Sequence, residues 1–469
     1  MLDFGMAATF VNLDRNTPML LPPDLRDWVD DGDLVHFVIE ACERLPLEAF
    51  RVNHRGSGSA QMPPHMMLAL LVYCYCNSIF SSRKIERATY RDVAVRYLTA
   101  DTHPDHDTIC KFRRENKAAI SAAFVDILEL ARSLGLLKLG KVATDGTHIK
   151  ANASIDQNVT YDRAVELRKR LQADIAELMA EAEKADAEGQ DDQSLPEEIS
   201  RREALKAKMD QAITELESRA AKRREKAQKD YEAKVKARKA QEKESGKKPR
   251  GKSPKPPGSI EEIASASNEQ CNLTDPDARI MRKNTRSGYT QSYNCQATVD
   301  ADGSGLIVGQ HLTQSASDAN ELLPAYRSIP AELGKPTAQL SDAGYLNSKD
   351  ITHLQEEEGC DVYCSAHRED AHNERRYDYR PPDKSERKVR ELKDPVLIAM
   401  RDKLATEEGK AIYKKRASTI ETVFGIIKSV LGFRGFSLRG LEKVKGEWGL
   451  VCLSHNIKRL HTLKTAVMS

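Results

Sequence analysis

The stretch Val142-Ala143-Thr144-Asp145-Gly146-Thr147-His148 places an acidic residue inside a run whose β-branched side chains favour a strand. A second stretch has the same character: Gln339-Leu340-Ser341-Asp342-Ala343-Gly344-Tyr345. We expect each aspartate to lie at the end of a buried strand. A third acidic residue, Glu421, is expected to open a helix that carries Lys428 seven residues later.

These three acids, Asp145, Asp342 and Glu421, are candidates for one catalytic site that also binds metal. Carboxylates are hard oxygen ligands and suit Mg²⁺ or Mn²⁺. Two such ions about 4 Å apart catalyse phosphodiester hydrolysis and transfer. Each acid also has a purely structural explanation. The two aspartates fit turns that contain glycine, and Ser418-Thr-Ile-Glu421 fits a capping box at a helix start.

The settings of the three acids resemble those of the DDE transposases of bacterial insertion sequences, whose ribonuclease-H-like core holds two Asp and one Glu. The resemblance covers nearly the whole chain. Tyr413, Arg416, Glu421 and Lys428 are similar to the tyrosine–arginine–glutamate–lysine signature of that superfamily. Four residues separate Arg416 from Glu421 where the family usually has three, whereas the six residues between Glu421 and Lys428 match.

The resemblance implies that the three acids hold two Mg²⁺ or Mn²⁺ ions and that Tyr413, Arg416 and Lys428 contact DNA. On a regular helix Glu421 and Lys428 share one face, whereas Arg416 points elsewhere. We therefore expect Arg416 just outside the helix start, folded back towards DNA. The same helix is expected to bury a stripe formed by Val423, Phe424, Ile427 and Leu431.

The order of predicted elements indicates an α/β fold with a ribonuclease-H-like mixed sheet. Residues 1–136 are expected to form a helical N-terminal DNA-binding domain, and residues 137–157 the first part of the catalytic core. Residues 158–262 are expected to form a long helical insertion between the first two core strands. Residues 263–469 would complete the core and add C-terminal helices.

The insertion carries apolar residues at helical spacing on both sides of a break at residues 189–196. This pattern indicates an antiparallel helical hairpin within the chain, or a coiled coil between two chains. Ten Lys and Arg residues lie between Lys234 and Lys255, against only Glu242 and Glu244. This linker-like stretch is compatible with a basic tail that binds phosphates and with a solvated linker.

The N-terminal region contains a helix expected to begin after Pro104-Asp105-His106-Asp107, with Asp107 as its N-cap. Its residues Lys111, Arg113 and Arg114 would form a basic face that binds DNA. A short helix, a turn and a basic helix outline a helix-turn-helix. The alternative is a helical bundle whose solvated face happens to be basic.

The composition of the chain indicates the broad class of protein and its cellular location. The 73 Lys and Arg residues nearly balance the 71 Asp and Glu residues, so the net charge of +2 does not by itself indicate a nucleic-acid-binding protein. The nine cysteines show no disulfide-like or zinc-binding spacing and indicate reduced thiols. The longest apolar run, residues 66–76, is too short to span a bilayer, and no secretory signal is apparent. We therefore expect a cytoplasmic, nucleoid-associated protein without membrane contact.

Together these patterns predict a transposase that binds the terminal inverted repeats of an insertion sequence, cleaves the DNA there and joins it to target DNA. Its partners would be double-stranded DNA, both transposon ends and target, and a second copy of the chain in a paired-end complex. Two alternatives remain. One is a metal-dependent nuclease of the same fold that does not join strands, and the other is a catalytically silent, transposase-derived DNA-binding protein.

Overall fold

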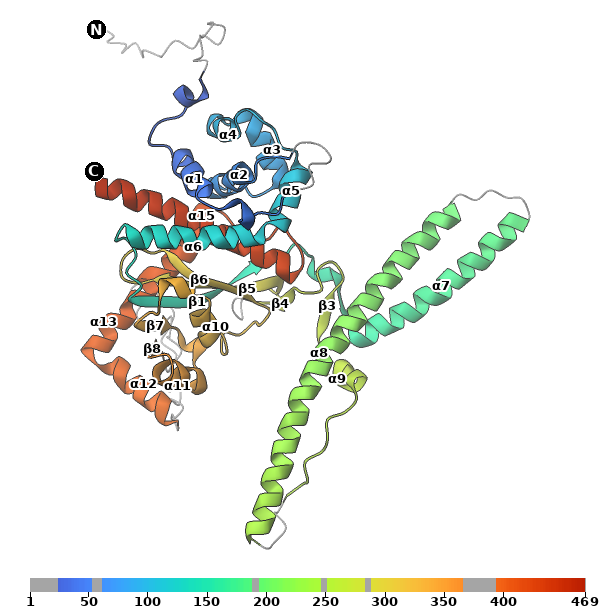
Figure 1. The fold of residues 1–469 in the computed structure, drawn as a ribbon. Coiled ribbons are helices and arrows are strands. Elements are labelled where there is room, and N and C mark those ends of the chain that lie inside the picture. Colours follow the sequence, from blue (N-terminus) through green and yellow to red (C-terminus); the bar gives the residue numbers. More distant parts are fainter. Residues whose placement is uncertain are drawn as a thin grey trace, which may run out of the picture.

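The centre of the computed structural model is a six-stranded mixed sheet (Figure 1). The structure describes residues 24–52, 61–187, 194–245, 251–282, 288–365 and 394–468. The strands are β1 (Lys141–Lys150), β4 (Arg279–Met281), β5 (Thr290–Asp300), β6 (Ile307–Thr313), β7 (Ala338–Ser341) and β8 (Asp361–Cys364).

The sheet has the strand order β6-β5-β1-β7-β8, with β4 beside β6 on the same edge of β5. Strand β5 is antiparallel to β1, whereas β7 and β8 are parallel to β1 and to each other. Ten of the eleven residues of β5 are buried, as expected for an interior strand. This arrangement confirms the predicted ribonuclease-H-like α/β fold, with the insertion between the first two core strands.

Helices cover both sides of the sheet; in Figure 1, α6 and α15 lie above it and α10, α11 and α12 below it. Those after β6 are α10 (Leu322–Arg327), α11 (Ser348–Glu356), α12 (Pro395–Ala405), α13 (Glu407–Arg416), α14 (Thr422–Gly425) and α15 (Leu441–Met468). Those before β1 are α1 (Leu34–Glu43), α2 (Pro64–Cys76), α3 (Ser82–Arg91), α4 (Val93–Leu98), α5 (His106–Glu115) and α6 (Lys117–Ser133).

The N-terminal helices share one hydrophobic core with the sheet and with α15. The largest fully buried side chains of that core include Tyr75 of α2, Trp448 of α15, and Phe433, which precedes α15. The Trp448 indole N–H also donates to the Gln296 carbonyl of β5 at 3.2 Å. The predicted domain boundary near residue 136 remains a prediction, because a shared core does not separate two folding units.

The insertion is a helical hairpin formed within one chain, and it projects from the core (Figure 1). Its elements are β2 (Asn158–Thr160), α7 (Tyr161–Ala187), α8 (Ser194–Ser245), α9 (Ile260–Ala266) and β3 (Gln270–Asn272). The antiparallel pair β2–β3 closes the base of the hairpin. Near that base the apolar stripes bury each other, with Leu171 and Met209 at 8% and 1% exposure.

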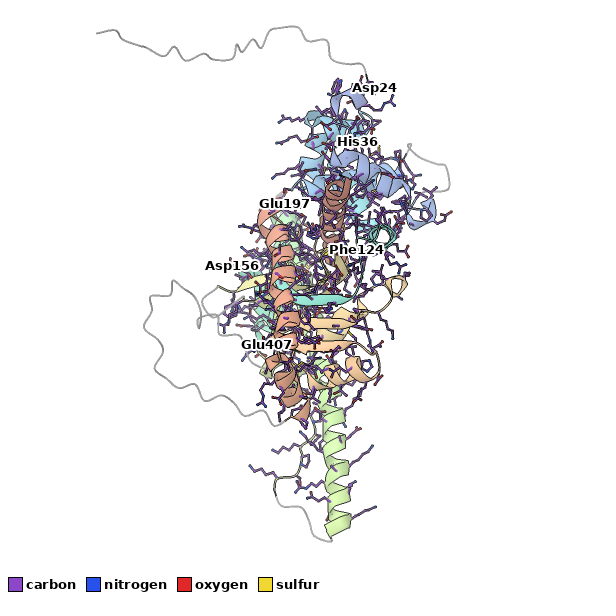
Figure 2. The ribbon with its side chains drawn as sticks, turned by 90° about the vertical axis from the view of Figure 1, so that its left-hand side faces the viewer. Asp24, His36, Phe124, Asp156, Glu197 and Glu407 are labelled. Atoms are coloured by element: carbon purple, nitrogen blue, oxygen red, sulfur yellow. The ribbon has the colours of Figure 1, made fainter. Side chains whose placement is uncertain are left out.

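Helix α8 has 52 residues and is therefore about 78 Å long. Beyond the hairpin it continues as a single helix whose side chains extend away from it (Figure 2). The linker expected between Lys247 and Gly258 lies partly outside the described residues. Among the described helices, none is long and apolar enough to cross a membrane.

A buried polar network fastens α5 to α15. The Arg113 guanidinium donates to the Tyr75 hydroxyl at 2.8 Å and to the Phe80 carbonyl at 3.1 Å. It lies 3.6 Å from the Glu447 carboxylate, and Arg113 and Glu447 are 3% and 0% exposed. The expectation that Arg113 belongs to an exposed basic face is therefore wrong. Asp107 is not the N-cap of α5 either, because Asp105 accepts from the Thr108 N–H at 2.7 Å.

We predict that Arg113→Ala destabilises the protein by about 3 kcal/mol or more, because it leaves the Glu447 carboxylate buried without its cation. Chemical denaturation followed by circular dichroism measures the change. The neighbouring exposed variant Arg114→Ala is the matched control and should stay within about 0.5 kcal/mol of the wild type. Equal stability of the two variants would show that the buried network is not needed.

Candidate active site

The register of two parallel strands brings two distant aspartates together. Val142 of β1 pairs with Gln339 of β7, and Ala143 pairs with Leu340, so partners differ by 197 positions. Asp342 also lies 197 positions after Asp145. The two carboxylates therefore project from matching positions just beyond the last paired residues. Asp145 lies within β1 rather than at its end, as we had expected, because β1 continues beside β5 as far as Lys150.

Backbone N–H groups hold both carboxylates in place. Asp145 accepts from the Gly146 N–H at 2.8 Å, and Asp342 accepts from the Gly344 N–H at 2.8 Å. Burial, together with the negative charge of Asp342, raises the pKa of Asp145 to about 7. The Gly146 N–H and the Arg416 guanidinium oppose this rise. Asp145–Gly146 is not a hairpin turn, whereas Asp342 does cap a short 3₁₀ turn at residues 343–345.

A further carboxylate, that of Asp318, borders this pair and was missed by the sequence analysis. It accepts from the Asn294 amide at 2.8 Å and from the Gln296 amide at 2.6 Å, both on β5. Its negative charge contributes to the raised pKa of Asp145. Polar amides at alternate positions of a buried strand are the signal that could have indicated a polar site beside β5.

Gly146 makes this close approach possible. It lies opposite Gln296 in the β1–β5 register. A β-carbon at position 146 would lie 2.3 Å from the Gln296 amide nitrogen and 2.6 Å from an Asp318 carboxylate oxygen. A side chain at position 146 would therefore displace the Gln296 amide and the Asp318 carboxylate from their present positions.

Glu421 lies inside a continuous helical segment and does not open a helix. The turn Ala417–Glu421 is a π-helix that follows α13 directly, and a second π-turn, Ile426–Val430, follows α14. The capping-box explanation of Glu421 is therefore wrong. A π-turn closes i→i+5 hydrogen bonds and so holds one residue more than an α-turn. The extra residue accounts for the unusual spacing between Arg416 and Glu421.

Arg416 is also placed differently from our expectation. It is buried within the helical segment, not folded back outside it, and its Nη2 atom lies 3.6 Å from Glu421 Oε1. The same guanidinium lowers the pKa of Asp145 and lies 5.7 Å from the centre of the Tyr413 ring. Arg416 thus links the aspartate pair to Glu421, whose side chain is 59% exposed. The predicted buried stripe is confirmed at Val423, Phe424, Ile427 and Leu431.

Lys428 extends from the second π-turn to β1. Its ammonium group donates to the Thr147 hydroxyl and, at 3.4 Å, to the His148 carbonyl. Lys428 is half-buried. Burial lowers the pKa of His148. The negative charge of Asp318 opposes this effect, and the positive charge of Lys428 adds to it. The lysine is therefore held two residues past Asp145 on the same strand.

The donor set fits a hard divalent cation, since every candidate ligand is a carboxylate. A cation between Asp145 and Asp342 would offset the repulsion that raises the pKa of Asp145. Within the described part of the chain, no three His, Cys, Asp or Glu side chains lie close enough to hold a metal as they stand. Glu421 would have to turn away from Arg416 to join the pair.

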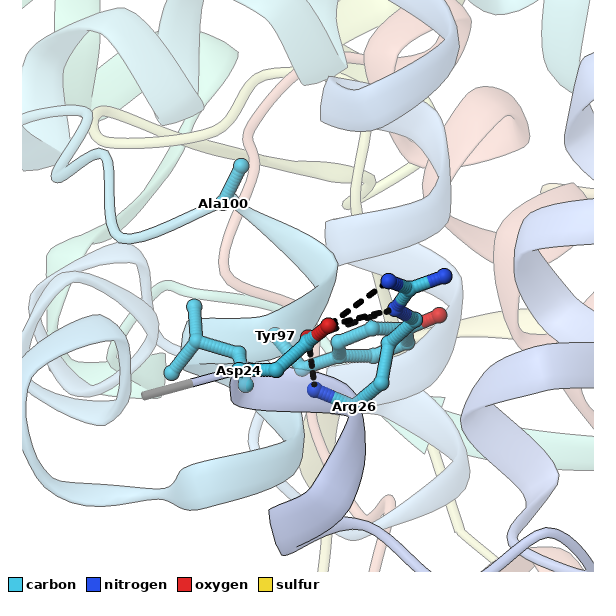
Figure 3. A pocket seen from close by; sticks show the side chains of 5 residues that line it. Asp24, Arg26, Tyr97 and Ala100 are labelled. Carbon is cyan, nitrogen blue, oxygen red and sulfur yellow. Dashed lines mark hydrogen bonds and ion pairs between the residues drawn. The ribbon is translucent and has the colours of Figure 1, made fainter. Parts of the chain in front are cut away.

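The remaining candidates lie on the N-terminal helices. Lys111 and Arg114 are exposed on α5, and Arg113 is buried as described above. A separate hollow of about 540 Å³ on these helices is lined by Asp24, Leu25, Arg26, Tyr97 and Ala100 (Figure 3). There the Arg26 guanidinium is bound to Asp24 at 2.6 Å, and none of the candidate residues lines the hollow.

Comparisons with known protein families agree with this geometry. Residues 23–115 match the family described as Transposase domain (DUF772), and residues 368–461 match the family described as Transposase DDE domain. The second match contains Tyr413, Arg416, Glu421 and Lys428. Searches of curated proteins and of solved structures found no match. The two family matches, together with a ribonuclease-H-like sheet that sets two aspartates side by side, support a DDE transposase of the insertion-sequence type.

Proposed function

We propose that this transposase binds the terminal inverted repeats of its mobile element, cleaves the DNA at the element ends and joins the released ends to target DNA. The observation that carries the proposal is the placement of Asp145 beside Asp342 by the β1–β7 register. Asp145, Asp342 and Glu421 are the proposed catalytic residues and metal ligands. Lys428, Arg416 and Tyr413 are proposed to contact DNA beside them.

The chemistry proposed for the site is phosphoryl transfer in two steps. Water first attacks the phosphodiester at the element end, and the bond to the 3′-oxygen breaks, which leaves a 3′-hydroxyl. That hydroxyl then attacks a phosphodiester of the target strand, and a new bond forms as the target 3′-oxygen leaves with a proton. Bound Mg²⁺ or Mn²⁺, two ions in our proposal, would activate the attacking oxygen and neutralise the leaving one.

The chain's own groups prepare this site. Hydrogen bonds from Gly146 and Gly344 fix the orientation of the two aspartates. Because Glu421 is mostly exposed, its side chain can turn from Arg416 without disturbing buried residues. Arg416 lies beside Glu421, and an arginine fork binds a DNA phosphate well. Lys428 adds a second cation along β1.

We predict that Asp145→Asn, Asp342→Asn and Glu421→Gln each abolish cleavage and joining while DNA binding persists. Each change removes a negative oxygen with little change in shape. The substrate is a set of labelled duplexes from the DNA that flanks the coding sequence on both sides, incubated with target plasmid and Mg²⁺ or Mn²⁺. Ca²⁺ should support binding without chemistry.

The products of that reaction separate the three candidate functions. Nicked and joined DNA supports the transposase, and nicked DNA alone supports a nuclease. DNA that is bound but unchanged supports a silent DNA-binding protein. Near-wild-type cutting by any of the three acid variants would remove that residue from the catalytic set.

A second prediction concerns stability without metal. The folded-state pKa of Asp145, about 7, lies above its ordinary value of 3.8. Between these values the unfolded carboxyl is ionised while the folded one keeps its proton, so wild-type stability falls as pH rises. Asp145→Asn should therefore melt at a higher temperature than the wild type in EDTA, with a gain that is small near pH 4 and largest above pH 7.

Asp318→Asn extends this comparison, which differential scanning calorimetry can follow across pH. The Asp318 charge affects Asp145 less than the Asp342 charge does. Its removal should therefore raise the melting temperature in EDTA by less than Asp145→Asn does. An unchanged melting curve for Asp318→Asn would place that carboxylate outside the electrostatic cluster. A loss of stability in Asp145→Asn at pH 8 would contradict the crowding of carboxylates altogether.

A third prediction concerns the arm. We propose that the α7–α8 hairpin supports a homodimeric paired-end complex and that the basic end of α8 contacts DNA backbone. Thr160 pairs with Gln270 at the base, so a short Gly/Ser turn can replace residues 161–269. The shortened protein should keep single-end binding, whereas paired-end complexes in gel-shift assays and strand joining should fall sharply.

A charge variant separates the two proposed contributions of the arm. Lys234→Glu, Lys236→Glu and Lys239→Glu together keep the hairpin but reverse charge on the single-helix end of α8. Weaker DNA binding with normal dimerisation would assign that end to DNA. Full joining by the shortened protein would reduce the arm to a dispensable insertion.

A further inference from the structure

Helix α3 has one buried face and one basic face. Ile85, Ala88 and Thr89 are buried, at 0%, 8% and 0% exposure. At 3.6 residues per turn, the opposite side carries a stripe about 120° wide. This stripe, which we call the α3 basic face, consists of the exposed residues Arg83, Lys84, Arg87, Tyr90 and Arg91.

The acidic residues near this face are engaged elsewhere. Glu86 is bound by the His106 ring at 2.9 Å, and Asp92 caps α4 by accepting from the Val95 N–H at 3.0 Å. Asp101 accepts from the Arg96 guanidinium at 2.9 Å. Across the part of the chain that the structure describes, no carboxylate lies within ion-pair distance of the four cations. No carboxylate of the described residues therefore neutralises their positive charge.

Exposed cations on other helices include ones that are paired. On α7, Arg170 pairs with Glu166, and on α8, Lys229 pairs with Glu225, one turn away in each case. Such pairs are the ordinary state of a solvated helix. On α5, exposed Lys111 and Arg114 share the surface with Asp107, which is 93% exposed. An unpaired cluster of four cations instead indicates an anionic partner.

The geometry of the face fits a nucleic-acid duplex. Arg83, Arg87 and Arg91 are one turn apart and extend over about 12 Å of helix, which is close to the width of the major groove. Tyr90 is 57% exposed and stacks on the His103 ring at 3.8 Å. The His103 ring is hydrogen-bonded to Thr89 at 3.1 Å, which holds this aromatic pair at the edge of the cations.

We propose that the α3 basic face, rather than the surface of α5, is the principal surface by which the N-terminal region holds the backbone of double-stranded DNA. The inference rests on the proposed function in so far as the bound DNA is a transposon end. Arg83, Lys84, Arg87 and Arg91 contact phosphates, and the buried side of α3 fixes the angle at which the helix meets the duplex.

The test uses the full-length protein and a fluorescently labelled 30-base-pair duplex of mixed sequence, with anisotropy measured across a NaCl series. The test variant combines Arg83→Ala, Arg87→Ala and Arg91→Ala, all exposed, and leaves Tyr90 intact. A second variant combines Lys111→Ala and Arg114→Ala on α5. A matched control, Lys335→Ala with Lys349→Ala and Arg401→Ala, removes three exposed charges from the catalytic region.

We expect the α3 variant to bind at least tenfold more weakly at low salt, with a slope of log affinity against log salt reduced by about 2 to 3. The α5 variant and the control should stay within about twofold of the wild type. Arg→Lys changes at the same α3 positions should restore most of the slope. Unchanged melting temperatures show that the variants are folded.

Wild-type affinity and slope in the α3 variant would overturn the proposal, as would an equal loss in the control. A loss confined to the α5 variant would transfer the DNA-binding surface to α5. These outcomes leave the proposed function standing if the wild type binds and cleaves the flank-derived duplexes. A wild-type protein that binds no duplex at any salt concentration would instead remove the proposed function.

Discussion

The parallel register of β1 and β7 is the constraint on which the rest of the site depends. A shift of one residue would turn the side chains of one strand to the other face of the sheet and separate Asp145 from Asp342. The register is held by burial, because Val142, Ala143 and Leu340 are all fully buried. A hydrogen bond from the Gln339 amide to the Thr144 hydroxyl and another between the Thr144 and Thr298 hydroxyls connect three neighbouring strands beneath the aspartates.

This constraint also explains how the core tolerates a long insertion. The arm leaves after β1 and returns before β5, and the β2–β3 pair brings the two ends of the arm together. Strands β1 and β5 can therefore pair over nine residues as if the insertion were a loop. Because the arm has its own small core, its length adds little to the entropic cost of pairing β1 with β5.

Glu421 comes from a helical segment and not from the sheet that carries the two aspartates. It is delivered by a helix with two π-turns, and the first turn brings Arg416 and Glu421 to the same side. π-turns store an extra residue inside a helix and occur often at functional sites. Arg416 holds Glu421 near the aspartate pair. In this position the Glu421 carboxylate is paired with the Arg416 guanidinium.

Much of this organisation could be predicted from the sequence. The strands that carry Asp145 and Asp342 follow from alternation and β-branched residues, and the hairpin follows from two helical stripes. The π-turn could not be predicted, because local sequence does not distinguish i→i+5 from i→i+4 bonding. Asp318 was missed because its role depends on amides from β5 that reach across Gly146.

The basic residues of the N-terminal region show a similar limit. Arg113 follows Ile109 by one turn and therefore lies on the buried side of α5, where Glu447 from the far end of the chain neutralises it. A basic residue on a helix cannot be assumed to be exposed, because a distant part of the chain can supply an acidic partner that buries it. The basic face of α3 was not identified from the sequence, although its cations and apolar residues fall on opposite sides of the helix.

We propose that Asp145, Asp342 and Glu421 hold the catalytic metal. Crystals grown with Mn²⁺ and duplex DNA, measured at the manganese absorption edge, test it most directly. We expect anomalous peaks coordinated by the carboxylates of Asp145 and Asp342, with Glu421 turned from Arg416 to the metal. Manganese bound elsewhere, with the two aspartates bound to none, would contradict it.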